Sequence, residues 1–292
     1  MTSRRAARCL LLAISLAASV WTVAAQELRL PNAGGSVKFA VIGDSGSGDR
    51  AQFEVGTQMA RFRRVFGFDR VIMLGDNIYG GQSARDLDRK FAQPYKALLD
   101  AGVQFYAALG NHDSQENRHY PPFGMAGRRY YTYAVKNVRF FVLDTDLLDS
   151  QQLAWFEAAL KTSQAAKDEW KICYFHHPLY SSGRTHGSDV NLRVVLEPLL
   201  LSYGVNVVFA GHDHIYERIK PQKGIYYFVS GSAGQLRRGD FRRSELSAAG
   251  YDQDYTFMLA EINKAELFFQ AVTRTGQIID AGTLPLQVRP QP

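Results

Sequence analysis

The stretch Val71-Ile72-Met73-Leu74-Gly75-Asp76-Asn77-Ile78-Tyr79 is an apolar run that ends in a glycine, an aspartate and a nearby tyrosine. A short apolar run bounded by turn residues is typical of a buried β-strand. Asp, Asn and Gly are the residues with which a chain commonly leaves a strand. Taken alone, the stretch predicts a strand and its turn, and it leaves open whether Asp76 and Tyr79 also face something bound there.

Four further apolar runs end in the same way. They cover residues 37–43, 103–110, 171–175 and 205–211, and polar residues follow each: Asp44, Asn111-His112-Asp113, His176-His177 and His212-Asp213-His214. Amphipathic patterns between the runs predict helices at residues 50–66, 84–99, 151–162 and 190–203. Hairpins are expected within residues 131–143 and 257–274. This alternation predicts an α/β fold with mixed sheets covered by helices.

The polar residues at the five strand ends have the chemistry of metal ligands. In α/β sheets the functional crevice lies beyond the carboxyl ends of the strands, so groups distant in sequence meet there. A single Gly-Asp is usually only a turn, but five of the seven histidines lie in these blocks. Carboxylate, amide and imidazole donors without thiolate suit zinc, manganese or iron. More than four donors favour two metals, an arrangement suited to phosphoryl transfer.

In order and spacing, the five blocks resemble those of the calcineurin-like metallophosphoesterases, and more narrowly the small, single-domain purple acid phosphatases of the tartrate-resistant type. The blocks are Gly43-Asp44-Ser45-Gly46, Gly75-Asp76-Asn77-Ile78-Tyr79, Gly110-Asn111-His112-Asp113, His176-His177-Pro178 and Gly211-His212-Asp213-His214. The resemblance implies a four-layer αββα sandwich, with two mixed β-sheets flanked by helices. Ser45 stands where the small animal enzymes typically carry tryptophan, so substrate preference does not carry over.

The resemblance also implies two metal sites that share Asp76 as a bridge. The first metal, Fe(III) in purple acid phosphatases, would be held by Asp44, Asp76, Tyr79 and His214. The second, which in that family is Fe(II), Zn(II) or Mn(II), would be held by Asp76, Asn111, His176 and His212.

Two histidines are implied to be catalytic. His112 matches the histidine that contacts the substrate phosphate and assists the leaving group, and His186 lies near the position of a second such histidine. A metal-bound hydroxide would attack phosphorus in line, while a protonated histidine gives its proton to the leaving oxygen. The roles of His177 and His119 stay open.

The first 25 residues predict a secretory signal peptide. Arg4, Arg5 and Arg8 precede an apolar run of about 15 residues and the small-residue site Val23-Ala24-Ala25. An uncleaved membrane anchor, the alternative, needs roughly 20 apolar residues. The sequence thus predicts a signal peptide at residues 1–25 and one catalytic domain at residues 26–292. The protein would be exported, to a periplasm or out of the cell, with no membrane attachment after cleavage.

The net charge and the cysteine content limit which substrates and which covalent cross-links are expected for this chain. Residues 26–292 hold 31 basic and 28 acidic residues, a net charge of +3, and the single cysteine Cys173, which allows no internal disulfide. The arginines in segments 118–133 and 230–243 suit an anionic substrate. The alternative is that these segments are only solvent-exposed charged loops. A small phosphorylated substrate is expected and nucleic acid is not, although aromatic rings with arginine also suit base stacking. The oligomeric state is not predicted.

Two rival functions remain open. One is a manganese- or zinc-dependent phosphodiesterase or nucleotidase of the same superfamily. Tyr79 argues for the purple acid phosphatases instead, because its position three residues after Asp76 separates that family from most of its relatives. The discriminating test is the visible charge-transfer band that a tyrosinate bound to Fe(III) should give. The other rival is a non-catalytic metal- or phosphate-binding protein, against which His112 argues, because a binding protein needs no acid for a leaving group.

Overall fold

Two mixed β-sheets form the centre of the computed structural model, which describes residues 28–287. The predicted signal peptide, residues 1–25, lies outside the described residues. In spatial order the first sheet holds β13 (Ile278–Pro285), β12 (Glu266–Thr273), β11 (Thr256–Asn263), β1 (Val37–Ile42), β2 (Arg70–Leu74) and β3 (Gln104–Ala108). The second holds β10 (Ser247–Tyr251), β8 (Tyr216–Gln222), β9 (Ile225–Ser230), β7 (Val207–Ala210), β6 (Trp170–Tyr174), β5 (Val138–Val142) and β4 (Tyr131–Val135).

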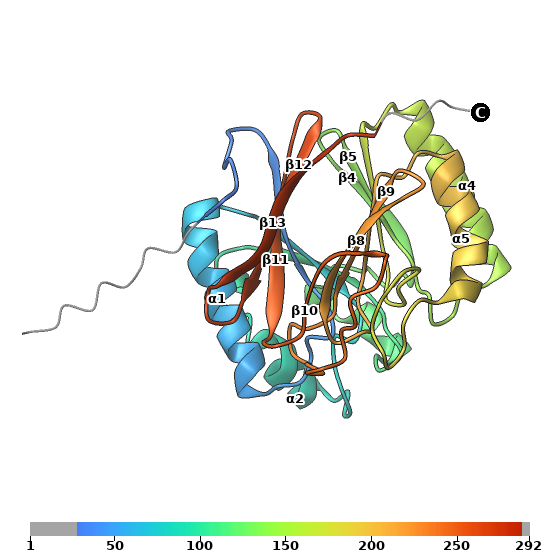
Figure 1. Ribbon diagram of the computed structural model, residues 1–292. Coiled ribbons are helices and arrows are strands. Elements are labelled where there is room, and N and C mark those ends of the chain that lie inside the picture. Colours follow the sequence, from blue (N-terminus) through green and yellow to red (C-terminus); the bar gives the residue numbers. More distant parts are fainter. Residues whose placement is uncertain (1–27, 288–292) are drawn as a thin grey trace, which may run out of the picture.

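Helices cover the outer faces of both sheets (Figure 1). α1 (Arg50–Phe66) lies over the first sheet, and α4 (Ser150–Ala165) and α5 (Val190–Ser202) lie over the second. Each helix turns a stripe of apolar side chains at helical spacing toward its sheet, such as Val55, Met59, Phe62 and Phe66 on α1. The predicted four-layer αββα sandwich is therefore confirmed.

Aromatic packing joins the two sheets. The ring of Phe39 on β1 meets Phe140 on β5 and Phe209 on β7 edge to face, at centroid distances of 5.5 and 6.2 Å. Edge-to-face contacts between buried rings add to the gain from apolar burial. This packing fixes the separation of the sheets and thereby the positions of the loops at their ends.

One predicted helix is wrong in its extent. The sequence pattern favours a single helix over residues 84–99, but the structure divides it into α2 (Ala84–Leu87), the π-helical turn η1 (Asp88–Ala92) and α3 (Lys96–Leu99). Pro94 lies in the break, where its missing N–H and its ring prevent a continuous helix. Lys90 is buried and donates hydrogen bonds from Nζ to the carbonyl oxygens of Tyr79 and Gly81, at 2.5 and 2.9 Å. The interrupted helix thus supports the loop that follows β2.

The strands that carry the polar residues run parallel within each sheet. β1, β2 and β3 are parallel neighbours in the first sheet, and β5, β6 and β7 are parallel neighbours in the second. Within each sheet the carboxyl ends of these strands therefore lie at one edge. The two edges lie together, because His176 Nδ1 contacts the carbonyl oxygen of Leu74 and the His212 N–H donates to Asp44. Along this edge lie the short 3₁₀ turns η2 (Gln115–His119) and η3 (Pro121–Phe123), which follow β3.

Candidate metal centre

Three of the candidate ligands lie in strained turns directly after strands. Asp44, Asp76 and His212 have φ angles of 52°, 52° and 70°, in the left-handed region that residues other than glycine rarely adopt. Such strain persists where the surroundings fix the backbone, and it is concentrated at functional sites. Here the loops hold one another, because the backbone N–H of His212 donates to Asp44 Oδ2 at 2.8 Å and that of His112 donates to Asp76 Oδ1 at 2.9 Å.

Glycines make room for these carboxylates. A Cβ placed on Gly110 would lie 2.3 Å from Asp76 Oδ1, and one on Gly211 would lie 2.5 Å from Asp44 Oδ2. Neither separation is tolerated by packed atoms. The glycines before the Asn111 and His212 blocks therefore allow the close approach of these carboxylates.

The first donor set surrounds the hydroxyl group of Tyr79. This oxygen lies 3.1 Å from Asp44 Oδ1 and 3.1 Å from His214 Nε2, and the last two atoms are 3.4 Å apart. Asp76 also belongs here, since one ligand atom each from Asp44, Asp76 and His214 lies within 4.8 Å of the others. All three residues are buried.

The second donor set surrounds Nε2 of His176. This atom lies 3.0 Å from Asn111 Oδ1, 3.1 Å from His212 Nδ1 and 3.4 Å from Asp76 Oδ1. Its other ring nitrogen, Nδ1, lies 2.9 Å from the carbonyl oxygen of Leu74, which only accepts, so Nδ1 carries the proton. In the neutral ring, the lone pair of Nε2 faces two oxygens that are also acceptors.

Both sets fit metal ions. A metal ion with ligands at about 2.0–2.2 Å places neighbouring donor atoms about 3 Å or slightly more apart, which matches separations of 3.0 to 3.4 Å in both sets. In the second set, acceptor atoms converge without a shared proton when His176 is neutral, and a cation between them would satisfy them. Because Asp76 lies in both sets, the two sites would adjoin at that residue.

The pKa shifts at the site follow from the burial of several acidic and imidazole groups close together. Burial alone would lower the pKa of His176, but the adjacent Asp76 carboxylate raises it to about 9. Burial opposes the ionisation of Asp76, yet His176 holds the pKa of that carboxyl well below its usual range. Burial, with Asp44 and Asp76 nearby, raises the pKa of the Tyr79 phenol far above its ordinary value. The Asp76 carboxylate thus favours positive charge at Nε2 of His176.

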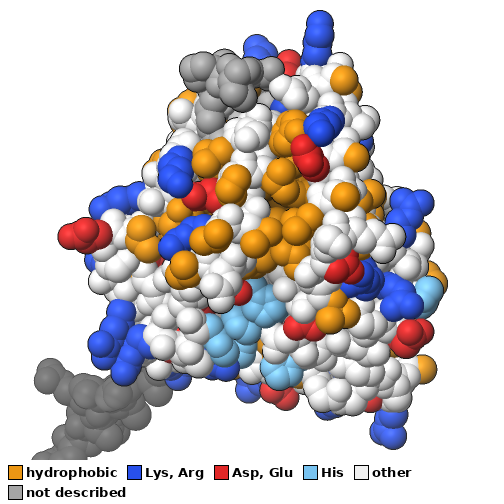
Figure 2. Space-filling view, turned by 90° about the vertical axis from the view of Figure 1, so that its right-hand side faces the viewer, with side chains coloured by type: hydrophobic (Ala, Val, Ile, Leu, Met, Phe, Trp, Pro, Cys, Tyr) orange, Lys and Arg blue, Asp and Glu red, His pale blue; other side chains and the backbone are white. Residues whose placement is uncertain are grey.

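The two predicted catalytic histidines lie at the rim of these sets. The side chain of His112 is 51% exposed, and its Nε2 lies 4.0 Å from Asp76 Oδ2. Its ring packs on Tyr79 with a centroid distance of 4.7 Å. His186 is exposed and its ring lies 4.0 Å from that of His212. Figure 2 shows histidine side chains gathered at one place on the surface.

Two aspartates inside the ligand blocks, Asp113 and Asp213, hold the site loops together. Asp113 accepts hydrogen bonds from the backbone N–H groups of Asn77, Ile78 and Gly110 and from the Asn77 amide. It thereby ties the loop after β2 to the loop after β3. Asp213 accepts from the Ser181 hydroxyl and the Gly187 N–H, which fixes the loop that bears His186. Their places inside the ligand blocks were the only signal of these roles.

His177 and His119 differ in their distance from the donor sets. His177 packs against His176 and His212 at centroid distances of 5.0 and 4.5 Å, and its Nδ1 lies 3.0 Å from the Thr145 hydroxyl. Burial and the adjacent His176 lower its pKa to about 4. His119 lies outside both sets, beside Gly127.

A pocket of about 520 Å³ opens beside the second donor set. His177, His186 and His212 form its wall toward the donor set. Thr185 and the start of α5, with Asp189 and Asn191, line the rest. The lining is mostly polar, which suits a hydrophilic group attached to a phosphate.

A four-layer sandwich with two adjoining sets of metal-type donors at one edge has the architecture of a metallophosphoesterase. Residues 37–216 match the family described as calcineurin-like phosphoesterase, and the chain belongs to this family. A rat protein, tartrate-resistant acid phosphatase type 5, is 26% identical over 87% of this chain and 92% of its own length.

Two solved structures share the fold. The purple acid phosphatase PPD1 from yellow lupin superposes with a TM-score of 0.69 and 18% identity, covering 88% of this chain and 55% of the lupin chain. GAP50, described as the anchor in the inner membrane complex of Plasmodium, has a TM-score of 0.73 and 19% identity, covering 88% of this chain and 90% of its own. At these identities the likeness concerns the fold alone, so activity must be argued from the site.

Proposed function

We propose that this protein is an exported acid phosphatase that hydrolyses phosphomonoesters with the help of two metal ions. One observation carries the proposal: acceptor atoms of Asp76, Asn111 and His176 converge beside a second set that contains a tyrosine hydroxyl. Its membership of the phosphoesterase family and its similarity to a rat acid phosphatase support the same function.

The donor chemistry favours different metals in the two sets. The first set, with a phenol oxygen and two carboxylates, suits Fe(III), held by Asp44, Asp76, Tyr79 and His214. The second, with two imidazoles, an amide and one carboxylate, suits Fe(II), Zn(II) or Mn(II), held by Asp76, Asn111, His176 and His212. When bound, such a pair supplies Lewis-acid chemistry: it activates water as a nucleophile and neutralises charge on the phosphoryl oxygens.

Side chains of this protein would donate the proton to the leaving oxygen and hold the substrate. His112 reaches solvent beside Asp76, and its Nε2, 4.0 Å from Asp76 Oδ2, would give a proton to the leaving oxygen of the ester. His186 borders the pocket at the second donor set and would hold a phosphate oxygen or the leaving group. Asp213 keeps His186 in place through the loop at residues 181–187.

Export rests on the first 25 residues, which lie outside the described part of the chain. Within residues 28–287, no helix is both long and apolar enough to cross a membrane. N-terminal sequencing of protein recovered from the exported fraction should begin at about Gln26. Recovery of the uncleaved chain from the membrane fraction would instead support an anchor.

The proposed activity is tested with two aryl esters and a spectrum. The metal-replete protein should hydrolyse p-nitrophenyl phosphate faster than bis(p-nitrophenyl) phosphate and show a visible charge-transfer band. A colourless, iron-free protein that prefers the diester would favour the manganese- or zinc-dependent phosphodiesterase. Absence of hydrolysis from acidic to alkaline pH, with metals bound, would favour a binding protein.

A further inference from the structure

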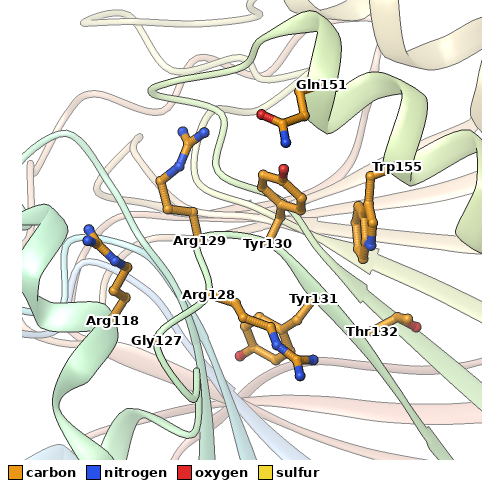
Figure 3. A pocket seen from close by; sticks show the side chains of 9 residues that line it. All are labelled: Arg118, Gly127, Arg128, Arg129, Tyr130, Tyr131, Thr132, Gln151 and Trp155. Atoms are coloured by element: carbon orange, nitrogen blue, oxygen red, sulfur yellow. The ribbon is translucent and has the colours of Figure 1, made fainter.

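A second groove, of about 580 Å³, lies at the same edge of the sandwich but belongs to neither donor set. We call it the Arg128 groove; its main lining residues are Arg118, Arg128, Arg129, Tyr130, Gln151 and Trp155 (Figure 3). It contains part of the arginine- and aromatic-rich segment 118–133, for which the proposed hydrolysis has no use.

Strand pairing places the groove relative to the metal centre. Tyr131, the first residue of β4, pairs with Val142 at the carboxyl end of β5, so the groove lies at the edge that carries the donor sets. Two adjacent residues link the sites. Asp144 pairs with Arg129 of the groove at 3.3 Å, and Thr145 contacts His177 beside the second donor set.

The three arginines of the groove differ in how far their charge is already satisfied. Arg129 pairs with Asp144 and Asp149 and donates to the carbonyl oxygen of Leu147. Arg118 donates to the carbonyl oxygen of Gln115 and lies 3.6 Å from Glu116. Arg128 is exposed, and within residues 28–287 its guanidinium has no hydrogen-bond or ion-pair partner. The groove therefore offers one unpaired guanidinium fork, a good partner for an anion.

Two aromatic rings form an apolar wall of the groove. Tyr130 and Trp155 are partly exposed, and their ring centroids lie 4.9 Å apart at an interplanar angle of 49°. Gln151 lies one turn before Trp155 on α4, so both face the same side of that helix. In Figure 3 the Gln151 side chain is drawn above the hydroxyl end of Tyr130, and the Trp155 ring is drawn beside the Tyr130 ring. The flat surface of the two aromatic rings, with the Gln151 amide at its rim, suits a planar ring that carries polar groups at its edge.

We propose that the Arg128 groove binds planar aromatic anions. The ring of the ligand packs on Trp155 and Tyr130, and its acidic group pairs with Arg128. A guanidinium and an aromatic wall in one groove recognise the two halves of such a molecule, whereas an anion alone or a neutral ring alone uses only one half. This binding does not depend on the proposed hydrolysis.

Isothermal titration calorimetry with naphthalene-2-sulfonate tests the proposal, because this anion has no phosphate ester to hydrolyse and sulfonates are weak metal ligands. We expect saturable binding of one molecule per chain. Methanesulfonate, an anion without a ring, and 2-naphthol, a ring without the charge, should each bind at least about tenfold more weakly. Equal affinity for 2-naphthol, or no saturable heat, would overturn the proposal.

Variants then locate the binding site. Arg128→Gln and Trp155→Leu should each weaken binding about tenfold, the loss of one charge-assisted contact or one stacking partner. Arg64→Gln is the matched control, since Arg64 is an exposed arginine on α1, outside the groove. Unchanged affinity in Arg128→Gln would contradict the proposal. This result would decide the matter even if the Trp155→Leu variant did not fold.

One further variant separates this inference from the proposed function. Asp76→Ala removes a residue of both donor sets but none of the groove. It should bind naphthalene-2-sulfonate as tightly as the unmodified protein does. If binding is lost in this variant, the anion occupies the metal centre and the groove is not its site.

Discussion

At the scale of the residue, Tyr79 is the side chain that distinguishes an iron-containing centre from a centre with other metal pairs. Its hydroxyl lies between Asp44 and His214, and burial with two carboxylates raises the pKa of the phenol, so only a strong Lewis acid would ionise it. Tyr79→Phe should keep two metals per chain, since Asp44, Asp76 and His214 remain, and should lose the visible band. Spectra and elemental analysis measure both.

Tyr203→Phe is the matched control, because Tyr203 lies at the end of α5 and donates to Glu157. It should keep the band. A visible band that survives in Tyr79→Phe would show that the band does not come from Tyr79, and would contradict the assignment of Tyr79 as an iron ligand.

His112→Ala should keep its metals and lose turnover. The side chain lies at the rim of the donor sets, 4.0 Å from Asp76, and a positioned general acid typically contributes about 10²- to 10⁴-fold. We therefore expect kcat for p-nitrophenyl phosphate to fall at least about 100-fold at unchanged metal content. His119→Ala, a histidine outside the donor sets, should be as active as the unmodified protein. Loss of metal from His112→Ala would make His112 a ligand instead.

Most of the candidate site residues could be predicted from the sequence because they follow apolar runs, whereas His186 was predicted only from the family resemblance. The nine residues named as ligands or catalysts lie at one edge, although their roles remain proposals. The positioning roles of Asp113 and Asp213 could not be predicted. Their hydrogen-bond partners lie up to 36 residues away, and only the folded loops bring them together.

At the scale of the element, the turns after the strands depend on glycines that leave room for carboxylates. Gly110→Ala would place a methyl group 2.3 Å from Asp76 Oδ1 and 2.5 Å from the Asp76 backbone nitrogen, so the loop must shift. We expect a folded protein whose content of both metals is reduced. Circular dichroism and elemental analysis measure these properties.

Gly34→Ala is the matched control, since a Cβ there meets nothing within 4 Å and the residue has no positive φ. It should keep full metal content. A Gly110→Ala protein with two metals and normal activity would show that the close approach to Asp76 is not needed.

The elements themselves were predictable to different degrees. α1 begins and ends where its apolar stripe predicts, at Arg50 and Phe66. The region of residues 84–99 was predicted as one helix because its apolar spacing is helical throughout. That spacing contains no sign that Lys90 turns inward to the carbonyl oxygens of Tyr79 and Gly81. Pro94 is the local signal for the break, because its missing N–H and its ring interrupt a helix.

At the scale of the whole molecule, alternating patterns predict an α/β sandwich but not its strand order. β1 pairs antiparallel with β11, with Val37 opposite Ile262, and this pairing joins the two ends of the domain. Pairings between strands so distant in sequence depend on packing of the complete chain. The layers were therefore predictable, and the order of the strands was not.

Metal removal should destabilise the whole domain. Asp44 and Asp76 are buried carboxylates in one donor set. A metal ion that binds only the native state stabilises that state by mass action. At a free metal concentration of 1,000 times Kd, the free energy of unfolding rises by about 4 kcal/mol. For a domain of this size that corresponds to a fall in Tm of about 10 °C on chelation. Scanning calorimetry with and without chelator measures it. An unchanged Tm, with the metals shown to be removed, would contradict a structural contribution of the centre.

The shared position of Asp76 is the central claim, and the metal content of Asp76→Ala tests it most directly. Elemental analysis of the unmodified protein should give two metal ions per chain. The variant, folded by circular dichroism, should hold close to none, because one residue serves both sites. Two metal ions per chain in the variant would contradict the bridging role of Asp76 and the paired centre built on it.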